Sequence, residues 1–337
     1  MKSCNDKIRI TLWDYYPEER LVFSGFLIRR NGKEGILDDY EKSLLSCDYD
    51  NIVIVQYDSL LDIPCYFTHD NSFESFEYSA CNAVGNRYAF LCKFSGRWGF
   101  LDDGFHIIVP FEYEDIKVLS YIQDLMCFAV KSDGKWGLFK NGRLEIACIY
   151  EEIESLEAKD GKYYKVKENG LYGVVNSAGK TIVPCNYDYV NKWSKVLLRV
   201  RSAGKWGLYQ MDGTPALPCL YDSINVNKVQ AVVKLKNQYG MWVKTDAWKL
   251  FIPCEFDNIE HLSATVCFNG LSMDYPSVVT RNKKQGLYVL VNNKPLKLVP
   301  TEYDRICKHR DGYIVLVKDN SGVPLLEYLK TKAVEID

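Results

Sequence analysis

The chain has 337 residues, of which 47% are hydrophobic and 26% charged, and its formal net charge is −2. The apolar fraction is high enough to form a packed core, so the composition excludes a disordered chain. The near-neutral charge argues against a dedicated nucleic-acid binder, which carries a basic excess. No apolar run of about 18 residues occurs, so no membrane-spanning helix is expected. Residues 1–16 hold no apolar core typical of a signal peptide.

The composition also favours β-structure. The chain contains 24 Tyr, 15 Phe, 7 Trp and 22 Gly, and aromatic and β-branched residues suit a pleated, half-buried surface. Short stretches such as 128–131 and 164–167 alternate between apolar and polar residues, whereas long helical patterns are scarce. We therefore predict an all-β fold.

Internal repetition is the strongest feature of the sequence. Its first anchor is an aromatic residue followed by Gly and then by apolar residues. In the five complete copies, successive glycines lie 38, 36, 34 and 33 residues apart. These copies are Trp98-Gly99, Trp136-Gly137, Tyr172-Gly173, Trp206-Gly207 and Tyr239-Gly240. Weaker copies at Gly35 and Gly286 lack the aromatic residue.

A second anchor follows each first anchor and reads Pro-Cys-x-Tyr-Asp-x-Ile in its fullest form. Its best copies contain Tyr187-Asp188 and Tyr221-Asp222, and Phe256-Asp257 is close to them. Relaxed copies occur at Tyr49, Tyr113, Tyr150 and Tyr303, and a faint copy at 76–78 fills the gap between Tyr49 and Tyr113. The spacing predicts seven or eight units of about 35 residues.

The paired anchors resemble the WG (KWG) repeat family, which is found in many bacterial proteins. The resemblance spans about residues 30 to 310 and rests on Trp98-Gly99, Trp136-Gly137 and Trp206-Gly207 with the downstream Pro-Cys-x-Tyr-Asp. It implies a repeat architecture in a bacterial, cytoplasmic setting. It implies no particular reaction, because the family is built around a repeat.

Residues 127–157 illustrate the unit that we expect. Residues 127–132 alternate and predict a strand, which the turn at Asp133-Gly134 joins to a second strand over 135–140. The turn at Asn141-Gly142 leads to a third strand over 143–149, and 150–153 continues from it. Each unit is therefore predicted to be an antiparallel meander of three or four strands. The Gly inside the second of these strands indicates a bulge or a close backbone approach.

One such unit is too small to bury its aromatic face, so successive units are expected to share a continuous core. We predict a single domain over 1–337, with 1–30 as an N-terminal edge unit and 311–337 as a C-terminal edge or closing unit. A propeller-like closed array is the architecture we favour, and an open β-solenoid is the alternative.

The repeated anchors are interpreted as structural, because a functional site normally occurs once. The same interpretation applies to four cysteines at one repeat position: Cys148, Cys185, Cys219 and Cys254. Phe111 and Thr301 occupy the same position, which indicates packing rather than a metal site. No C-x-x-C pair and no N-x-S/T sequon occurs. A reduced, cytoplasmic setting fits these features, and no metal or cofactor is expected.

Catalytic motifs are not found, so we expect the protein not to be an enzyme. The four histidines lie outside any recognisable triad spacing, and no sequence spacing singles out a catalytic carboxylate pair. A basic stretch over 192–205 alternates with apolar residues, as a half-exposed strand does. Nucleic-acid binding is therefore not favoured.

Two segments depart from the repeat, and insertions in repeat proteins often form the binding face. The interval between Phe256 and Gly286 is lengthened around residues 268–276. We therefore select the following residues as a candidate binding loop: Phe268, Asn269, Leu271, Met273, Asp274 and Tyr275. Residues 61–77, a degenerate aromatic stretch, are the second departure and could be a worn unit.

The function that we predict is a non-catalytic scaffold that binds another protein through loops and exposed aromatic residues. The alternative is binding of a glycan or small ligand on repeated Trp and Tyr platforms. An enzyme with a site at the centre of a ring is a third hypothesis. Aromatic residues exposed in a groove would favour a ligand, and aromatic residues buried between units would favour a scaffold.

Overall fold

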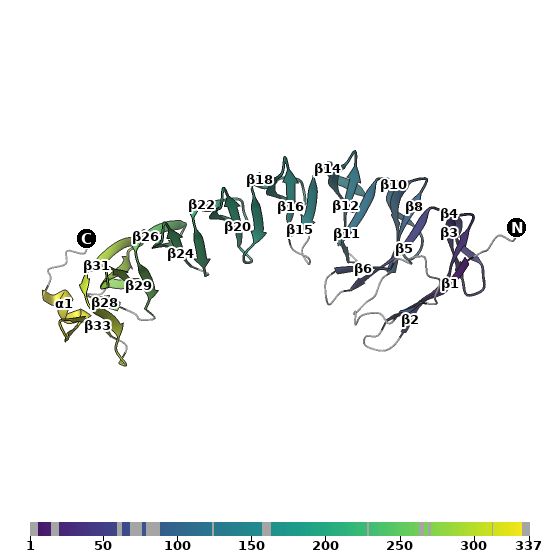
Figure 1. Ribbon diagram of the computed structural model, residues 1–337. Helices are drawn as coiled ribbons and strands as arrows, with labels where there is room; N and C mark the ends of the chain where they lie inside the picture. Colours follow the sequence, from purple (N-terminus) through teal and green to yellow (C-terminus); the bar gives the residue numbers. More distant parts are fainter. Residues whose placement is uncertain are drawn as a thin grey trace. The chain divides into compact units, whose positions relative to one another are not determined.

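The computed structural model describes residues 6–14, 20–58, 63–67, 76–78, 88–122, 125–156, 163–227, 229–262, 266–268, 271–311 and 313–331. Within these residues the chain forms strands β1 to β34 and one short helix, α1 (Figure 1). The chain divides into two compact units, Met1–Lys192 and Trp193–Asp337. The predicted all-β fold is confirmed.

The first unit contains four sheets. The first has the order β4-β3-β2-β1-β7 and the second β10-β9-β8-β5-β6, and the third and fourth follow the chain as β11 to β14 and β15 to β18. The bounds in the first two sheets are β1 (Asp6–Asp14), β2 (Arg20–Arg30), β3 (Lys33–Asp38), β4 (Ser43–Tyr49), β5 (Asn51–Asp58), β6 (Ile63–Phe67), β7 (Phe76–Tyr78), β8 (Tyr88–Phe94), β9 (Arg97–Leu101) and β10 (Ile107–Tyr113). The next two sheets and the last strand of the unit are β11 (Asp115–Ile122), β12 (Leu125–Ser132), β13 (Lys135–Lys140), β14 (Arg143–Tyr150), β15 (Glu152–Ser155), β16 (Tyr163–Glu168), β17 (Leu171–Asn176), β18 (Thr181–Tyr187) and β19 (Tyr189–Lys192).

The second unit repeats this plan. It begins with β20 (Leu197–Ser202), β21 (Lys205–Gln210) and β22 (Pro215–Tyr221), followed by the sheet β23 (Ser223–Val226), β24 (Gln230–Leu235), β25 (Gln238–Lys244) and β26 (Trp248–Phe256). The next sheet contains β27 (Asn258–His261), β28 (Val266–Phe268), β29 (Leu271–Arg281), β30 (Lys284–Val291) and β31 (Lys294–Tyr303). The last sheet has only three strands, β32 (Arg305–Lys308), β33 (Ile314–Lys318) and β34 (Ser321–Pro324), and α1 (Leu325–Thr331) follows it.

The strands predicted over 127–149 are confirmed as β12, β13 and β14. The continuation over 150–153 is corrected, because β14 ends at Tyr150 and β15 begins at Glu152 in the next sheet. A single residue, Glu151, therefore joins two sheets. Four sheets are four-stranded antiparallel meanders, and the three five-stranded sheets add β7, β6 or β28 to four such strands. From the second sheet onward, the first strand directly follows the second anchor of the preceding sheet.

Cores lie between successive sheets within each unit. One cluster packs Trp136 and Ile146 of the third sheet against Tyr164 and Val166 of the fourth. Another packs Leu208 and its neighbours against the sheet β23 to β26. Sharing apolar faces in this way allows a unit of about 35 residues to bury side chains that it could not cover alone.

The described residues within 61–77 belong to two added strands and not to a worn repeat unit. β6 pairs antiparallel with β5, and β7 pairs parallel with β1, so both strands extend sheets that already have four. The described residues between Tyr49 and Tyr113 therefore form one repeat sheet of β5, β8, β9 and β10. The added strands β6 and β7 lie between β5 and β8 in the chain. The faint copy at 76–78 is corrected to the added strand β7.

The tandem antiparallel sheets are established, whereas closure of the array into a ring, the open alternative and the single-domain organisation stay predictions. Among the described residues, no helix is long and apolar enough to cross a membrane.

Candidate functional site

The glycine of the first anchor lies in the third of the four repeat strands in every sheet except the last, and the fourth of these strands passes very close to it. A Cβ atom built on Gly240 would lie 2.6 Å from the Cys254 sulfur and 2.8 Å from the Ile252 carbonyl oxygen. The register shifts at this point in the ladder, because Tyr239 pairs with Phe256 whereas Met241 pairs with Ile252. Both expectations for this glycine, a close approach and an irregular ladder, are confirmed.

Three of the four cysteines at the shared repeat position place their sulfur atoms over these glycines. The sulfur atoms of Cys185, Cys219 and Cys254 each lie under 3 Å from the Cβ position of the glycine opposite. Phe111 and Thr301 cover Gly99 and Gly286 in the same way. Burial raises the pKa of the Cys185 and Cys254 thiols, which disfavours the thiolate that a metal ion needs. Within the described residues no group of His, Cys, Asp or Glu could hold a metal ion.

The aromatic residue of the first anchor is covered by cations and paired with the second anchor. Trp136 pairs across the sheet with Tyr150, and Trp206 pairs with Tyr221. The Lys117 ammonium lies 4.4 Å from the ring centroid of Trp136. On Trp206, the Arg199 guanidinium lies 3.8 Å away and that of Arg201 5.3 Å. These cation–π contacts occupy ring surface that a planar ligand would need.

The remaining anchors have equivalent places. Tyr172 and Tyr239 lie in the third strands β17 and β25, with lysines over their rings. Tyr187 ends β18, and Asp188 separates it from β19.

The acidic residue of the second anchor ties two sheets together. Asp222 stands between β22 and β23, and its backbone N–H donates to the Lys234 carbonyl oxygen over 2.8 Å. One oxygen of its carboxylate accepts a hydrogen bond from Lys205 of the preceding sheet. The other accepts from the Lys236 amide in the turn of the following sheet at 2.8 Å. Asp222 therefore contacts both the sheet before it and the sheet after it.

The same arrangement recurs at other junctions and perturbs the acids. Hydrogen bonds from a lysine, with a turn amide as the next contribution, lower the pKa of Asp50, Asp222 and Asp304. At Glu151 the Gly170 amide is the largest cause of the lowered pKa. We refer to these lysine–acid–amide contacts as the junction clamps.

The two copies without an aromatic residue use a polar side chain instead. Glu34 is buried, pairs with Arg29 at 2.6 Å and accepts from the Ile52 amide at 2.7 Å. Gln285 accepts from the Ile306 amide at 2.6 Å. Both amides belong to the first strand of the next sheet, so these residues also serve the sheet-to-sheet connection.

The candidate binding loop forms the hairpin of β28 and the start of β29, in which Phe268 pairs with Leu271. Asn269 lies outside the described residues. Met273 is 1% exposed and belongs to the core, so it is not a contact surface. Asp274 is exposed, and Tyr275 adopts a φ of 52° where the ladder to β30 shifts register. The ladder of β29 is therefore irregular at the point where the inserted hairpin joins the rest of the sheet.

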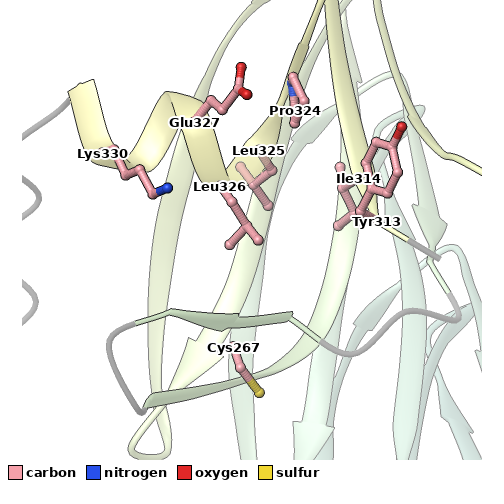
Figure 2. A pocket seen from close by; sticks show the side chains of 8 residues that line it. All are labelled: Cys267, Tyr313, Ile314, Pro324, Leu325, Leu326, Glu327 and Lys330. Atoms are coloured by element: carbon pink, nitrogen blue, oxygen red, sulfur yellow. The ribbon is translucent and has the colours of Figure 1, made fainter. Parts of the chain in front are cut away.

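A cleft of about 480 Å³ lies beside this hairpin, lined by residues of β28, of α1 and of the segment around β33 and β34 (Figure 2). Its lining residues are Cys267, Tyr313, Ile314, Pro324, Leu325, Leu326, Glu327 and Lys330. Leu325 and Ile314 are buried, whereas Leu326 is 43% and Tyr313 39% exposed. The hairpin was predicted from the sequence, whereas α1 was not. A signal for α1 exists in the apolar residues Leu325, Leu326, Tyr328 and Leu329, which recur at spacings of three and four.

The other sequence candidates form no catalytic cluster in the described residues. His106 is exposed beside Asp102, and His309 stacks on Tyr313 with ring centroids 4.5 Å apart. Burial lowers the pKa of His261. In the basic stretch, Arg199 and Arg201 cover Trp206 as described, and Lys205 belongs to a junction clamp.

Comparisons with known proteins identify the repeat. The family model described as "WG containing repeat" matches residues 98–136, 140–172 and 172–206. The comparison with curated proteins found no match.

Solved structures give only faint likenesses. A eukaryotic initiation factor is 8% identical, with 88% of this chain and 87% of that chain covered, at a TM-score of 0.31. Hsv2 of Kluyveromyces lactis is 12% identical, with 89% and 95% covered, at a TM-score of 0.28. These scores are too low to support an argument about architecture or function.

Proposed function

This chain carries the WG-containing repeat in consecutive copies over residues 98–206, and from that premise we propose that it is a non-catalytic scaffold that binds another protein. The observation that carries the proposal is the use of the repeated residues. The glycines are covered by the fourth strands, the acids hold the junction clamps, and the rings pack under cations. The residues that recur are committed to building the array.

A binding surface must then come from what does not recur. The β28–β29 hairpin and α1 are such features, and the cleft with its exposed Leu326 and Tyr313 lies between them. Apolar side chains of this kind, next to a polar rim, are typical of sites for protein partners.

Affinity purification of the tagged chain from its native cells, with mass spectrometry, tests the proposal. We expect one stoichiometric protein partner that the wild type retains through washing at moderate salt. A chain that emerges without a protein partner would contradict the scaffold. A glycan array would then test the alternative function, binding of a glycan on the Trp and Tyr platforms. That alternative predicts that Trp206→Ala abolishes glycan binding.

A further inference from the structure

The fourth strand of each repeat sheet lies at a sheet edge, and most of these edges carry a proline directly before the shared cysteine position. The prolines are Pro110, Pro184, Pro218, Pro253 and Pro300, in β10, β18, β22, β26 and β31. An exposed edge is a template for pairing with another chain, and a proline removes the N–H that such a chain would need. These five edges are therefore protected against strand addition.

The last sheet protects its edge in another way. In the register of β33 and β34, Leu316 pairs with Val323, just as Val233 pairs with Gly240 in the sheet of β23 to β26. Val323 therefore occupies the place that the repeat reserves for glycine, and it is 41% exposed because the described residues of this sheet include no fourth strand. A valine at this place cannot admit a strand in the repeat geometry, and Pro324 has no N–H to offer it.

The opposite edges of the sheets are short. The first strands β15, β19, β23, β27 and β32 have four residues each, and in the first two sheets this edge is formed by the added strands β7 and β6, of three and five residues. Very short edge strands give another chain little to pair with. β11 is longer, and it lies beside β6 of the preceding sheet.

β14 is the exception among the fourth strands. Ala147 stands where five other sheets have proline, and it is exposed. Ile149, two residues on, is 52% exposed, and Leu144 at the start of the strand is 45% exposed. The first sheet also lacks the proline, because Ser46 takes its place, but Asp48 occupies the position of Ile149 and puts a charge on that edge. At these two positions β14 alone carries neither a proline nor an acid nor an amide, among the fourth strands that the structure describes.

The backbone of Ala147 presents a donor and an acceptor at this edge. The Ile146 carbonyl oxygen and the Cys148 nitrogen both approach Gly137 in β13, and the nitrogen lies 2.9 Å from a Cβ atom built on that glycine. A trans peptide points its C=O and its N–H to opposite sides. Each of these two groups shares a peptide with Ala147, so the N–H and the C=O of Ala147 both point away from β13. One residue thus offers both groups that an antiparallel strand pair exchanges.

A second copy of this chain supplies a matching edge. In a two-fold antiparallel pairing of two β14 strands centred on Ala147, the N–H of each Ala147 donates to the C=O of the other. The exposed Leu144 and Ile149 of both copies lie along the same pair of strands, so apolar surface meets apolar surface. Because the pairing occupies the one fourth-strand edge that lacks this protection, the association ends at two copies.

We propose that two copies of this chain associate reversibly by antiparallel pairing of their β14 edges. The interface is a single pair of strands and is smaller than a standard protein interface, so the dimer forms at raised protein concentration. The inference goes beyond the scaffold function, because it concerns self-association and requires no other protein.

Sedimentation equilibrium of the full-length chain at concentrations up to about 1 mM tests this inference. We expect the wild type to pass from monomer to dimer and no further. Ala147→Pro should weaken the dimer by roughly tenfold or more, because it removes both of the exchanged N–H groups in the symmetric pair. The variant should fold, since five other sheets have proline at this place, and wild-type hydrogen exchange in β11–β13 checks this.

Ile149→Glu is a second variant that the fold should accept, since β10, β26 and β31 have glutamate at this position. It should also weaken the dimer, because it brings two carboxylates into the apolar part of the interface. Leu220→Glu is the matched control. Leu220 is 55% exposed at the same position of β22, where Pro218 already protects the edge, so this variant should dimerise like the wild type.

Pro218→Ala provides the opposite test. The Leu217 oxygen and the Cys219 nitrogen lie 2.8 and 2.9 Å from a Cβ atom built on Gly207, so residue 218 points its backbone groups outward as Ala147 does. Replacing the proline restores an N–H beside the exposed Leu220. This variant should therefore associate beyond the dimer, because each copy then has two open edges.

A wild type that stays monomeric at every concentration, or a dimer that Ala147→Pro retains, would overturn the inference. So would a Pro218→Ala chain that associates no further than the wild type, because proline would then not be what protects these edges. A monomeric wild type that captures a native protein which Ala147→Pro loses would assign the β14 edge to a strand of that protein, and would equally overturn pairing with a second copy.

Discussion

At the scale of single residues, the repeated glycine, acid and cysteine each make contacts that build the sheets or join them. The glycine, the acid and the cysteine of the anchors were all predicted to be structural, and their neighbours explain why. The glycine admits the fourth strand, and the cysteine fills the space above it. The partners of the acid could not be predicted, because Lys205 and Lys236 lie on opposite sides of a sheet boundary that the sequence does not mark.

Gly240→Ala should destabilise its sheet by about 1–3 kcal/mol, the usual cost of overpacking. The added methyl group would meet a sulfur and a carbonyl oxygen that cannot both retreat. Hydrogen exchange of the β24–β26 amides measures the change. Gly322→Ala is the control, because its new methyl group would meet only the Val315 side chain at 3.3 Å. Equal protection in the two variants would contradict the role assigned to the close approach.

The junction clamps predict how stability depends on pH. Asp222 has a pKa in the folded chain below its ordinary value of 3.8, chiefly through Lys205. The stabilisation that the Asp222 carboxylate gives to the folded chain is therefore fully present above the pKa of this group in the unfolded chain. It is lost as the pH falls through the pKa in the folded chain. Thermal unfolding followed from pH 7 to pH 3 should show a weaker acid dependence in Asp222→Asn than in wild type. The control is Asp246→Asn at an exposed bend, which should unfold with the same pH dependence as the wild type. If Asp222→Asn also shows the wild-type pH dependence, the stabilising role of this junction clamp is wrong.

Elements could be predicted where local chemistry decides them. The strands over 127–149 follow from alternation and from the turns at Asp133-Gly134 and Asn141-Gly142, which both adopt positive φ. The strands β6 and β7 could not be predicted, because their pairing with β5 and β1 depends on contacts far along the chain. The cleft could not be predicted for a similar reason, because its lining residues come from the hairpin at 266–273 and from a helix more than 50 residues later.

Helix α1 should be essential to the last sheet although it has only seven residues. Leu329 is 1% exposed in a core shared with Ile314 and Leu316, so Leu329→Ala should cost about 2–5 kcal/mol. Hydrogen exchange in β32–β34 reports this loss. Leu326→Ala, on the exposed side of the same helix, should leave exchange nearly unchanged while it weakens retention of the protein partner. A large stability loss in Leu326→Ala would show that the two leucines do not have separate roles.

At the scale of the whole chain, the cores between successive sheets predict stability that is local and propagates to neighbours. Gly240→Ala should accelerate exchange in its own sheet and in the sheets next to it within the second unit, and leave β12–β17 as in wild type. A uniform acceleration across both units would instead indicate a single cooperative unfolding transition.

The radius of gyration from solution scattering tests the prediction that the array closes into a ring. A compact chain of this length has a radius of gyration of about 20 Å, and a closed ring would approach that value. A clearly larger radius would favour the open solenoid.

Val323 has a consequence for making longer versions of this protein. Every complete sheet offers a glycine to the strand that covers it, so an extra copy spliced in ahead of β32 would find the same fit on both sides. A copy fused after β34 would meet a branched side chain and a proline where it needs an open path. We therefore expect a copy inserted before β32 to join the array. A copy fused after β34 is not expected to pack in the repeat geometry.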